Sequence, residues 1–184
     1  SGRDVVIRTP RSRWILFAGL AAVIVVLDQV TKAVVAANLT PGQSVAVAGD
    51  LVRIVHGQNN GGLFGLFHGQ APVFAVVSLG VVALIVVYEA RAGASLAVTV
   101  ALGLLLGGAL GNLTDRIRIG YVVDFVDAGI GNVRWYTFNV ADAAISTSIV
   151  LLIVLAILGE WEERRRPVPA TSDRPVASPG EGPE

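Results

Sequence analysis

Apolar residues are concentrated in four long runs, and polar residues lie mostly between them. The first run begins at Trp14 and its helical pattern continues to about Ala37; the others cover 71–88, 95–113 and 140–158. Each approaches the ~20 residues that an α-helix needs to cross a hydrocarbon core about 30 Å thick. The pattern predicts an all-α polytopic membrane protein with four transmembrane helices and outer loops at 38–70 and 114–139.

The loop at 38–70 has a pattern of its own. Valines alternate with smaller residues over 45–48, Gly49-Asp50 is a turn signal, and apolar residues flank Arg53 over 52–54. This alternation predicts a small β-hairpin or sheet on the outer membrane surface, forming a β-rich cradle beside the helices. In the third run, Gly103, Gly107 and Gly111 are spaced by four, which predicts close packing against another helix.

Composition agrees with a membrane protein. Charged residues make up 15% of the chain and hydrophobic residues 53%, and the mean hydropathy is +0.67; a soluble domain averages about 25% charged residues. A net charge of zero argues against a nucleic-acid partner. The absence of cysteine excludes disulfides, thiolate metal sites and a cysteine nucleophile, and two histidines are too few for a histidine-rich metal site.

The distribution of arginine predicts the orientation. Arginines precede the first run, follow the fourth and occur once between the second and third, whereas fewer lie in the two long loops. By the positive-inside rule, 1–13 is a cytoplasmic segment, 14–158 a single membrane domain and 159–184 a cytoplasmic tail, whose prolines indicate disorder. The first run also resembles a cleavable signal peptide, but Asp28 and Lys32 are unusual in such a segment and favour a retained span.

Several polar residues are expected at one level of the membrane. An ionisable group at the centre of a span costs at least ~2.5–3.5 kcal/mol on insertion scales, so it is a candidate for function. Asp28 lies about 21 Å along the first helix from Trp14, and the predicted topology places the other members of the group at the same outer level. They are Asp28, Asn112, Asp115, Asp124, Asn139 and Asp142.

Asp124 stands out because apolar side chains surround it in the sequence. Burial raises the pKa of a carboxyl, and two carboxyls in such a place can share one proton, so that one acts as general base and the other as general acid. Each acid also has a structural interpretation. Asp115 could pair with Arg116, Asp28 with Lys32 four residues on, and Asp142 could be a first-turn acid that favours its helix.

The chain resembles the bacterial lipoprotein signal peptidases (signal peptidase II) in five blocks that occur in the same order. These blocks are DQVTK at 28–32, NNGGLFG at 59–65, GGALGNLTDR at 107–116, GYVVDF at 120–125 and FNVAD at 138–142. The resemblance extends over about 14–158, and the last three blocks together are highly specific.

The resemblance implies an integral membrane aspartic endopeptidase that removes signal peptides from prolipoproteins on the amino side of a diacylglyceryl-modified cysteine. It implies Asp124 and Asp142 as the catalytic pair, no cofactor, a location in the bacterial cytoplasmic (inner) membrane and a monomeric chain. By motif position, further residues line or brace the site and hold substrate. These are Asn59, Gly61, Asn112, Arg116, Asn139, Asp28 and Lys32.

Two positions depart from the family pattern. Leu63 follows Gly62 where the family usually has two small residues, and Tyr136 stands where many members have proline.

Two other function classes are kept as alternatives. A proton-coupled transporter would need polar residues through the whole membrane depth, and runs such as 81–87 and 149–158 have none. A non-catalytic membrane scaffold is separated from an enzyme only by an activity measurement.

Overall fold

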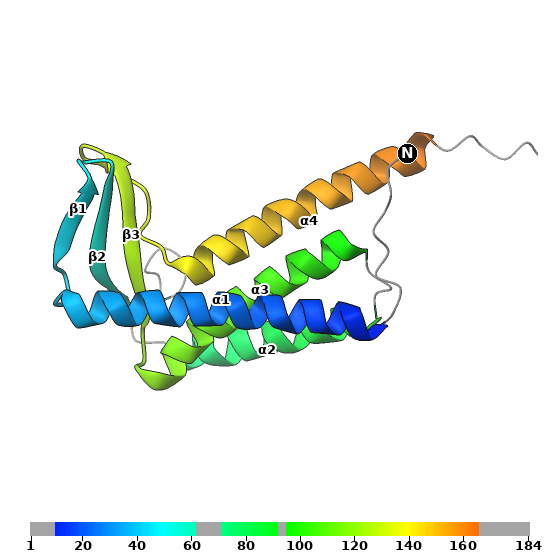
Figure 1. Ribbon diagram of the computed structural model, residues 1–184, viewed down its shortest axis with the longest axis horizontal. Helices are drawn as coiled ribbons and strands as arrows, with labels where there is room; N and C mark the ends of the chain where they lie inside the picture. Colours follow the sequence, from blue (N-terminus) through cyan, green and yellow to red (C-terminus); the bar gives the residue numbers. More distant parts are fainter. Residues whose placement is uncertain (1–9, 62–70, 92–94, 166–184) are drawn as a thin grey trace, which may run out of the picture.

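Four long helices form a bundle, and a small sheet stands at one end of it (Figure 1). The computed structural model describes residues 10–61, 71–91 and 95–165. Its helices are α1 (Pro10–Asn38), α2 (Ala71–Arg91), α3 (Leu96–Arg118) and α4 (Val140–Arg165). Each of these helices contains a stretch long and apolar enough to cross a membrane, as the pattern of apolar runs predicted.

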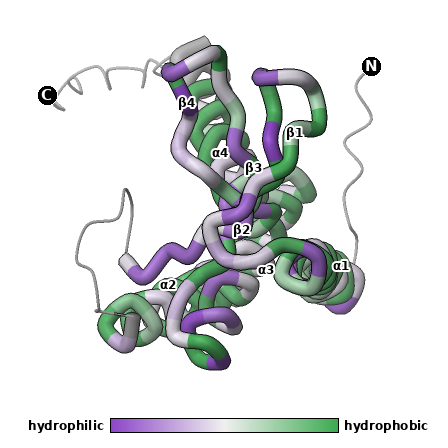
Figure 2. Tube along the Cα trace, turned by 90° about the vertical axis from the view of Figure 1, so that its left-hand side faces the viewer, coloured by the Kyte–Doolittle hydropathy of each residue, from purple (hydrophilic) through white to green (hydrophobic). Residues whose placement is uncertain are grey.

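Helix α3 is the central helix of the bundle. It contacts α1, α2 and α4 (Figure 2), and most of it is buried, whereas the other three helices expose most of their length. Phe17, Ile85 and Leu106 belong to the apolar core that α1, α2 and α3 share. Large apolar side chains such as Val76 and Ile153 point outward. An apolar exterior around a buried central helix is the arrangement expected of a bundle whose solvent is lipid.

The glycines of α3 allow its neighbours to come close. A Cβ at Gly107 would lie 2.7 Å from the Cβ of Ile24 on α1, and one at Gly103 would lie 3.1 Å from the carbonyl oxygen of Phe17. On another side of the helix, a Cβ at Gly108 would lie 2.5 Å from the carbonyl oxygen of Ala141 on α4. The expected close packing along this glycine series is therefore present, and α3 packs in this way against two helices.

The sheet has four antiparallel strands in the order β1-β2-β3-β4. Strands β1 (Ser44–Ala48) and β2 (Val52–Asn59) form the predicted hairpin, with Gly49 at a φ of 55° in the turn. Strands β3 (Val122–Ile130) and β4 (Val133–Arg134) come from the second outer loop, and β3 pairs with β2. The all-α description was therefore too simple, because the cradle is a sheet built from both loops.

Several helices are longer than the apolar runs indicated. Helix α3 does not end at 113 but continues to Arg118, where Ile119 forms the C-cap and Gly120 turns the chain with a φ of 79°. Likewise α4 includes 159–165, which was expected to be tail, and α1 begins at Pro10. Polar residues at a helix end interrupt an apolar run without ending the helix. The rest of the tail, 166–184, lies outside the described residues.

Candidate active site

Asp124 lies on β3, where the sheet meets the helices, and is 4% exposed. The first four residues of β3 are buried, so the carboxyl is enclosed in an apolar strand. Asp124 is paired with Gly57 of β2, and a Cβ at Gly57 would lie 2.8 Å from the Asp124 carbonyl oxygen. A glycine here lets the two strands approach, which also brings Asn59 beside the carboxyl.

Asp142 lies in the first turn of α4 and forms a reciprocal cap with Asn139. The Asp142 N–H donates to Asn139 Oδ1 at 2.9 Å, and the Asn139 N–H donates to Asp142 Oδ2 at 3.3 Å. This is the pattern of a capping box, in which the residue before the helix and the third residue within it satisfy each other's backbone donors. The first-turn interpretation of Asp142 is therefore correct, and the cap also fixes the direction of its carboxylate.

Two asparagine side chains connect the two carboxylates. Asn139 Nδ2 donates to Asp124 Oδ1 at 2.7 Å and lies 3.2 Å from Asn112 Oδ1. Asn112 Nδ2 in turn donates to Asp142 Oδ1 at 2.8 Å. The two amides thus connect Asp124 on β3 to Asp142 on α4: the path runs through Asn139, which caps α4, and then through Asn112 on α3. These contacts bring together four of the residues that the predicted topology placed at one outer level.

The protonation of Asp124 is strongly perturbed. Burial, together with the nearby negative charge of Asp142, raises the pKa of Asp124 to about 7, although the amides of Asn59 and Asn139 partly oppose the rise. Near neutral pH this carboxyl therefore exchanges its proton readily. A group with such a pKa suits general acid–base chemistry, which is most effective when the pKa is close to the working pH.

A buried lysine supports the site from α1. Lys32 Nζ lies 2.7 Å from Asp28 Oδ2 and 2.8 Å from Asp115 Oδ2, and it donates to Asn112 Oδ1 at 3.1 Å. The expected pair between Asp28 and Lys32 is present. The expected partner of Asp115 was wrong, because among the described residues its ion pair is with Lys32. Since α3 continues through residue 118, Asp115 lies on the helix face that contacts α1, not in a loop beside Arg116.

Asp28 and Asp115, the two acids that pair with Lys32, also accept hydrogen bonds from backbone N–H groups of neighbouring elements. Asp28 Oδ1 accepts the N–H of Ala141 in the first turn of α4 at 3.0 Å. Asp115 Oδ2 accepts the N–H of Val123 on β3 at 3.2 Å. Lys32 and its two acids therefore connect α1 and α3 to the two segments that carry Asp142 and Asp124. The spacing of Asn112 and Asp115, three residues apart on one helix, is a signal that could have predicted this role for Asp115.

Arg116, near the end of α3, contacts α2. Its guanidinium carbon is 5.7 Å from the centre of the Phe74 ring on α2, and its Nη1 donates to the Asn112 carbonyl oxygen at 3.3 Å. Its positive charge is close enough to interact with Asp124 and Asp142. Arg116 thus belongs to the electrostatic surroundings of the two carboxylates.

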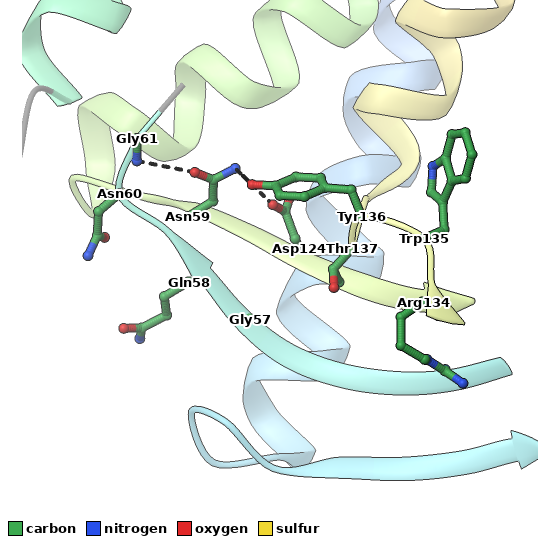
Figure 3. A pocket seen from close by; sticks show the side chains of 10 residues that line it. All are labelled: Gly57, Gln58, Asn59, Asn60, Gly61, Asp124, Arg134, Trp135, Tyr136 and Thr137. Atoms are coloured by element: carbon green, nitrogen blue, oxygen red, sulfur yellow. Dashed lines mark hydrogen bonds between the residues drawn. The ribbon is translucent and has the colours of Figure 1, made fainter. Parts of the chain in front are cut away.

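A cavity of about 620 Å³ opens beside Asp124 (Figure 3). Residues 57–61 of the β2 end form one side of it, and 134–137, before α4, form another. Asn59 Nδ2 donates to Asp124 Oδ2 and also to the Tyr136 hydroxyl, each at 3.1 Å, and Asn59 Oδ1 accepts the Gly61 N–H. Leu63, one of the two departures from the family pattern, lies outside the described residues.

The described residues contain no cluster of three or more histidine and acidic side chains arranged to hold a metal ion. His56 has a structural contact instead, because its Nδ1 lies 2.8 Å from the Leu39 carbonyl oxygen beyond the end of α1. His68 is outside the described residues. What the arrangement can do chemically follows from the pair Asp124 and Asp142, which can hold one proton between them at the edge of a cavity.

A second ion pair, which was not predicted from the sequence, lies at the opposite end of the bundle. Glu89 on α2 is fully buried; its Oε1 lies 2.9 Å from Arg13 Nε on α1 and accepts the Thr99 hydroxyl of α3 at 3.2 Å. The signal was an acid in the last turn of the second apolar run. The hydrophobic pattern alone predicts that this run ends at Tyr88, and so it places Glu89 outside the helix.

The sequence matches the family model described as signal peptidase (SPase) II over residues 20–158. The lipoprotein signal peptidase of Halothermothrix orenii is 36% identical over 143 residues, which cover 78% of this chain and 93% of that protein. The lipoprotein signal peptidase of Geobacillus kaustophilus is 40% identical over 136 residues, covering 73% of this chain and 88% of that one.

Two solved structures are similar in fold. Both are described as bacterial membrane enzymes obtained by the in meso method, at 2.3 Å and 1.9 Å resolution. The first has a TM-score of 0.74 at 30% identity and covers 81% of this chain and 92% of its own. The second has a TM-score of 0.67 at 33% identity and covers 74% of this chain and 89% of its own.

Proposed function

The chain belongs to the signal peptidase II family, and we propose that it is an aspartic endopeptidase that removes signal peptides from diacylglyceryl-modified prolipoproteins. Cleavage takes place on the amino side of the lipidated cysteine. The observation that carries the proposal is a pair of carboxyls, the buried Asp124 and the half-buried Asp142, which two asparagine amides connect; Asp124 lines a cavity.

In this mechanism the two carboxyls have different roles. Near pH 7 Asp124 holds the shared proton, since its pKa is raised to about 7, and it donates a hydrogen bond to the scissile carbonyl oxygen. Asp142 is ionised and removes a proton from the attacking water. As the water oxygen bonds to the carbonyl carbon, the Asp124 proton moves to the carbonyl oxygen and stabilises the charge that develops there. Asp142 then gives its proton to the leaving amine as the C–N bond breaks, and Asp124 regains its proton as the new carboxyl group forms.

The other predicted site residues position this pair. Asn139 and Asn112 hold the carboxylates in place, while Lys32 and Asp28 keep α1 against the first turn of α4. Asn59 and Gly61 line the cavity in which the substrate backbone would lie. The charge of Arg116 limits the repulsion between the two acids.

We further propose that both termini are cytoplasmic and that the sheet end of the bundle lies at the outer leaflet. The arginines in and before the first turn of α1, and those at and just beyond the end of α4, support this orientation through the positive-inside rule. The lipid of the substrate would stay in the bilayer, so a prolipoprotein would reach the site laterally. The bacterial cytoplasmic membrane is the location that this substrate requires.

The test is a gel-shift cleavage assay with purified protein in detergent or lipid. A diacylglyceryl prolipoprotein and its unlipidated precursor are incubated with wild type, Asp124→Asn and Asp142→Asn, and folding of each variant is checked by thermal unfolding. We expect the wild type to cut the lipidated form alone. We expect each folded Asn variant to lose activity by at least a factor of about 10³, as is typical when an acid–base residue is removed.

Two results would contradict the proposal in different ways. A folded wild type that leaves the lipidated substrate intact would favour a membrane scaffold of the same fold. A folded Asn variant that cuts at the wild-type rate would show that the altered aspartate is not catalytic, while leaving the peptidase activity established.

A further inference from the structure

Tyr136 contacts the candidate site directly. It lies in the irregular segment between β4 and α4. In Figure 3 its ring extends toward Asn59, and its hydroxyl oxygen accepts a hydrogen bond from Asn59 Nδ2 at 3.1 Å. Tyr136 therefore contacts a residue that itself donates to Asp124.

The Asn59 amide has a defined orientation because one of its partners is a carboxylate that can only accept and another is a backbone N–H that can only donate. A side-chain amide has two N–H donors and one acceptor oxygen. Here the oxygen accepts the Gly61 N–H at 3.1 Å, and the nitrogen donates to Asp124 Oδ2 and to the Tyr136 hydroxyl. If the amide were flipped, its oxygen would face the Asp124 carboxylate and its nitrogen would face the Gly61 donor.

We propose that Tyr136 is a positioning residue of this active site, whose hydroxyl holds the Asn59 amide in the orientation that donates to Asp124. The proposal rests on the function proposed above. It assigns a role to a hydrogen bond at the edge of the cavity that a phenylalanine at the same position cannot make. The ring itself forms part of the cavity wall beside Asp124.

The effect of Tyr136 on catalysis passes through the proton of Asp124. The donor from Asn59 favours the ionised carboxylate and so lowers the pKa of Asp124 against the larger rise caused by burial. The charges that face Asp124 from the packed elements are Asp142 on α4, Lys32 on α1 and Arg116 on α3. Removing the Tyr136 hydroxyl changes none of these charges, but it lets the Asn59 amide turn away from the carboxylate.

The experiment is the pH dependence of kcat/KM for a lipidated substrate, measured with wild type, Tyr136→Phe, Asn59→Ala and the double variant. A hydrogen bond to a charged group corresponds to a shift of about one pH unit, so Asn59→Ala should move the alkaline limb upward by about that amount. Tyr136→Phe should move it in the same direction by about half as much. The double variant should match Asn59→Ala, because without the amide the hydroxyl has nothing to position.

A matched control removes a hydroxyl elsewhere. Tyr88→Phe alters a half-exposed tyrosine at the far end of α2, near Glu89, and should leave the profile unchanged. The proposal is overturned if Tyr136→Phe gives the wild-type profile, or if its shift adds fully to that of Asn59→Ala. Absence of cleavage by the wild type would instead refute the proposed peptidase function, so the two failures are distinguishable.

Discussion

Asp124 is buried in an apolar strand, yet both its carboxylate oxygens accept hydrogen bonds from side-chain amides. Burial raises its pKa from 3.8 to about 7, and the neighbouring charge of Asp142 acts in the same direction. A shared proton between two acids requires that one of them keep a proton near neutral pH. The environment of this single residue therefore sets the pH range in which the pair can work.

We predict that kcat/KM falls as the pH rises through about 7, because the pair then loses its last proton. The free energy of unfolding should also fall as the pH rises. The folded protein binds the Asp124 proton more tightly than the unfolded chain, so this group lowers stability as the pH rises from about 4 to 7. Asp124→Asn should lose that part of the pH dependence of the melting temperature. An alkaline limb well above this range would contradict the prediction.

Within residues 10–61, 71–91 and 95–165, Lys32 is the only cation that forms an ion pair with Asp28 and Asp115. Lys32→Met should leave two buried carboxylates without it, and removing one partner from a buried ion pair costs about 3–5 kcal/mol. We expect a much lower melting temperature in detergent. As a control, Arg53→Met removes an exposed pair with Asp50 and should change little. Equal effects of the two variants would exclude a special role for Lys32.

At the scale of elements, glycine determines how closely α3 approaches its neighbours. A Cβ at Gly107 would lie 2.7 Å from the Ile24 Cβ and 2.9 Å from the Ala21 carbonyl oxygen. Gly107→Ala should therefore push α1 and α3 apart and lower stability by about 1–3 kcal/mol, as overpacking does. Gly80→Ala on α2 meets nothing within 4 Å and should not destabilise the protein. Thermal unfolding of both variants tests the difference, and similar melting temperatures would contradict it.

The elements differ in how well the sequence predicts them. The helices follow from the length of the apolar runs, and the hairpin at 44–59 follows from alternation around Gly49-Asp50. Strand β3 could not be recognised in the same way, because Val122–Phe125 is buried on both faces and has no alternation of period two. The end of α3 was placed at 113 because its last turn is polar; Gly120 was the stop signal.

The sequence could predict which residues gather at the candidate site, but not which of them contact one another. Topology and the matching blocks brought Asp124, Asp142, Asn112 and Asn139 to one level, and the structure places them in one hydrogen-bonded group. The pairing of Asp115 with Lys32 was not foreseen, since it depends on which face of α3 meets α1. The sequence pattern does not determine how α3 is rotated about its own axis relative to α1.

Considered as a whole molecule, the bundle has a buried polar group at each end. The carboxyl pair lies where the sheet meets the helices, while Arg13, Glu89 and Thr99 join α1, α2 and α3 at the opposite end. An apolar core that includes Phe17, Ile85 and Leu102 lies between the helices. The fold thus keeps the proposed catalytic pair and a structural ion pair at opposite ends of one small chain.

This separation predicts that Glu89→Gln affects stability without affecting chemistry. The substitution removes the negative charge that offsets the Arg13 guanidinium in a pair whose carboxylate is fully buried, so we expect a loss of about 3 kcal/mol. For a chain of this size that corresponds to a melting temperature lower by roughly 6–12 °C. Below the new melting temperature, the pH profile of kcat/KM should match that of the wild type, because Glu89 contacts none of the residues around Asp124. A shifted profile would show that the two ends are coupled through α3.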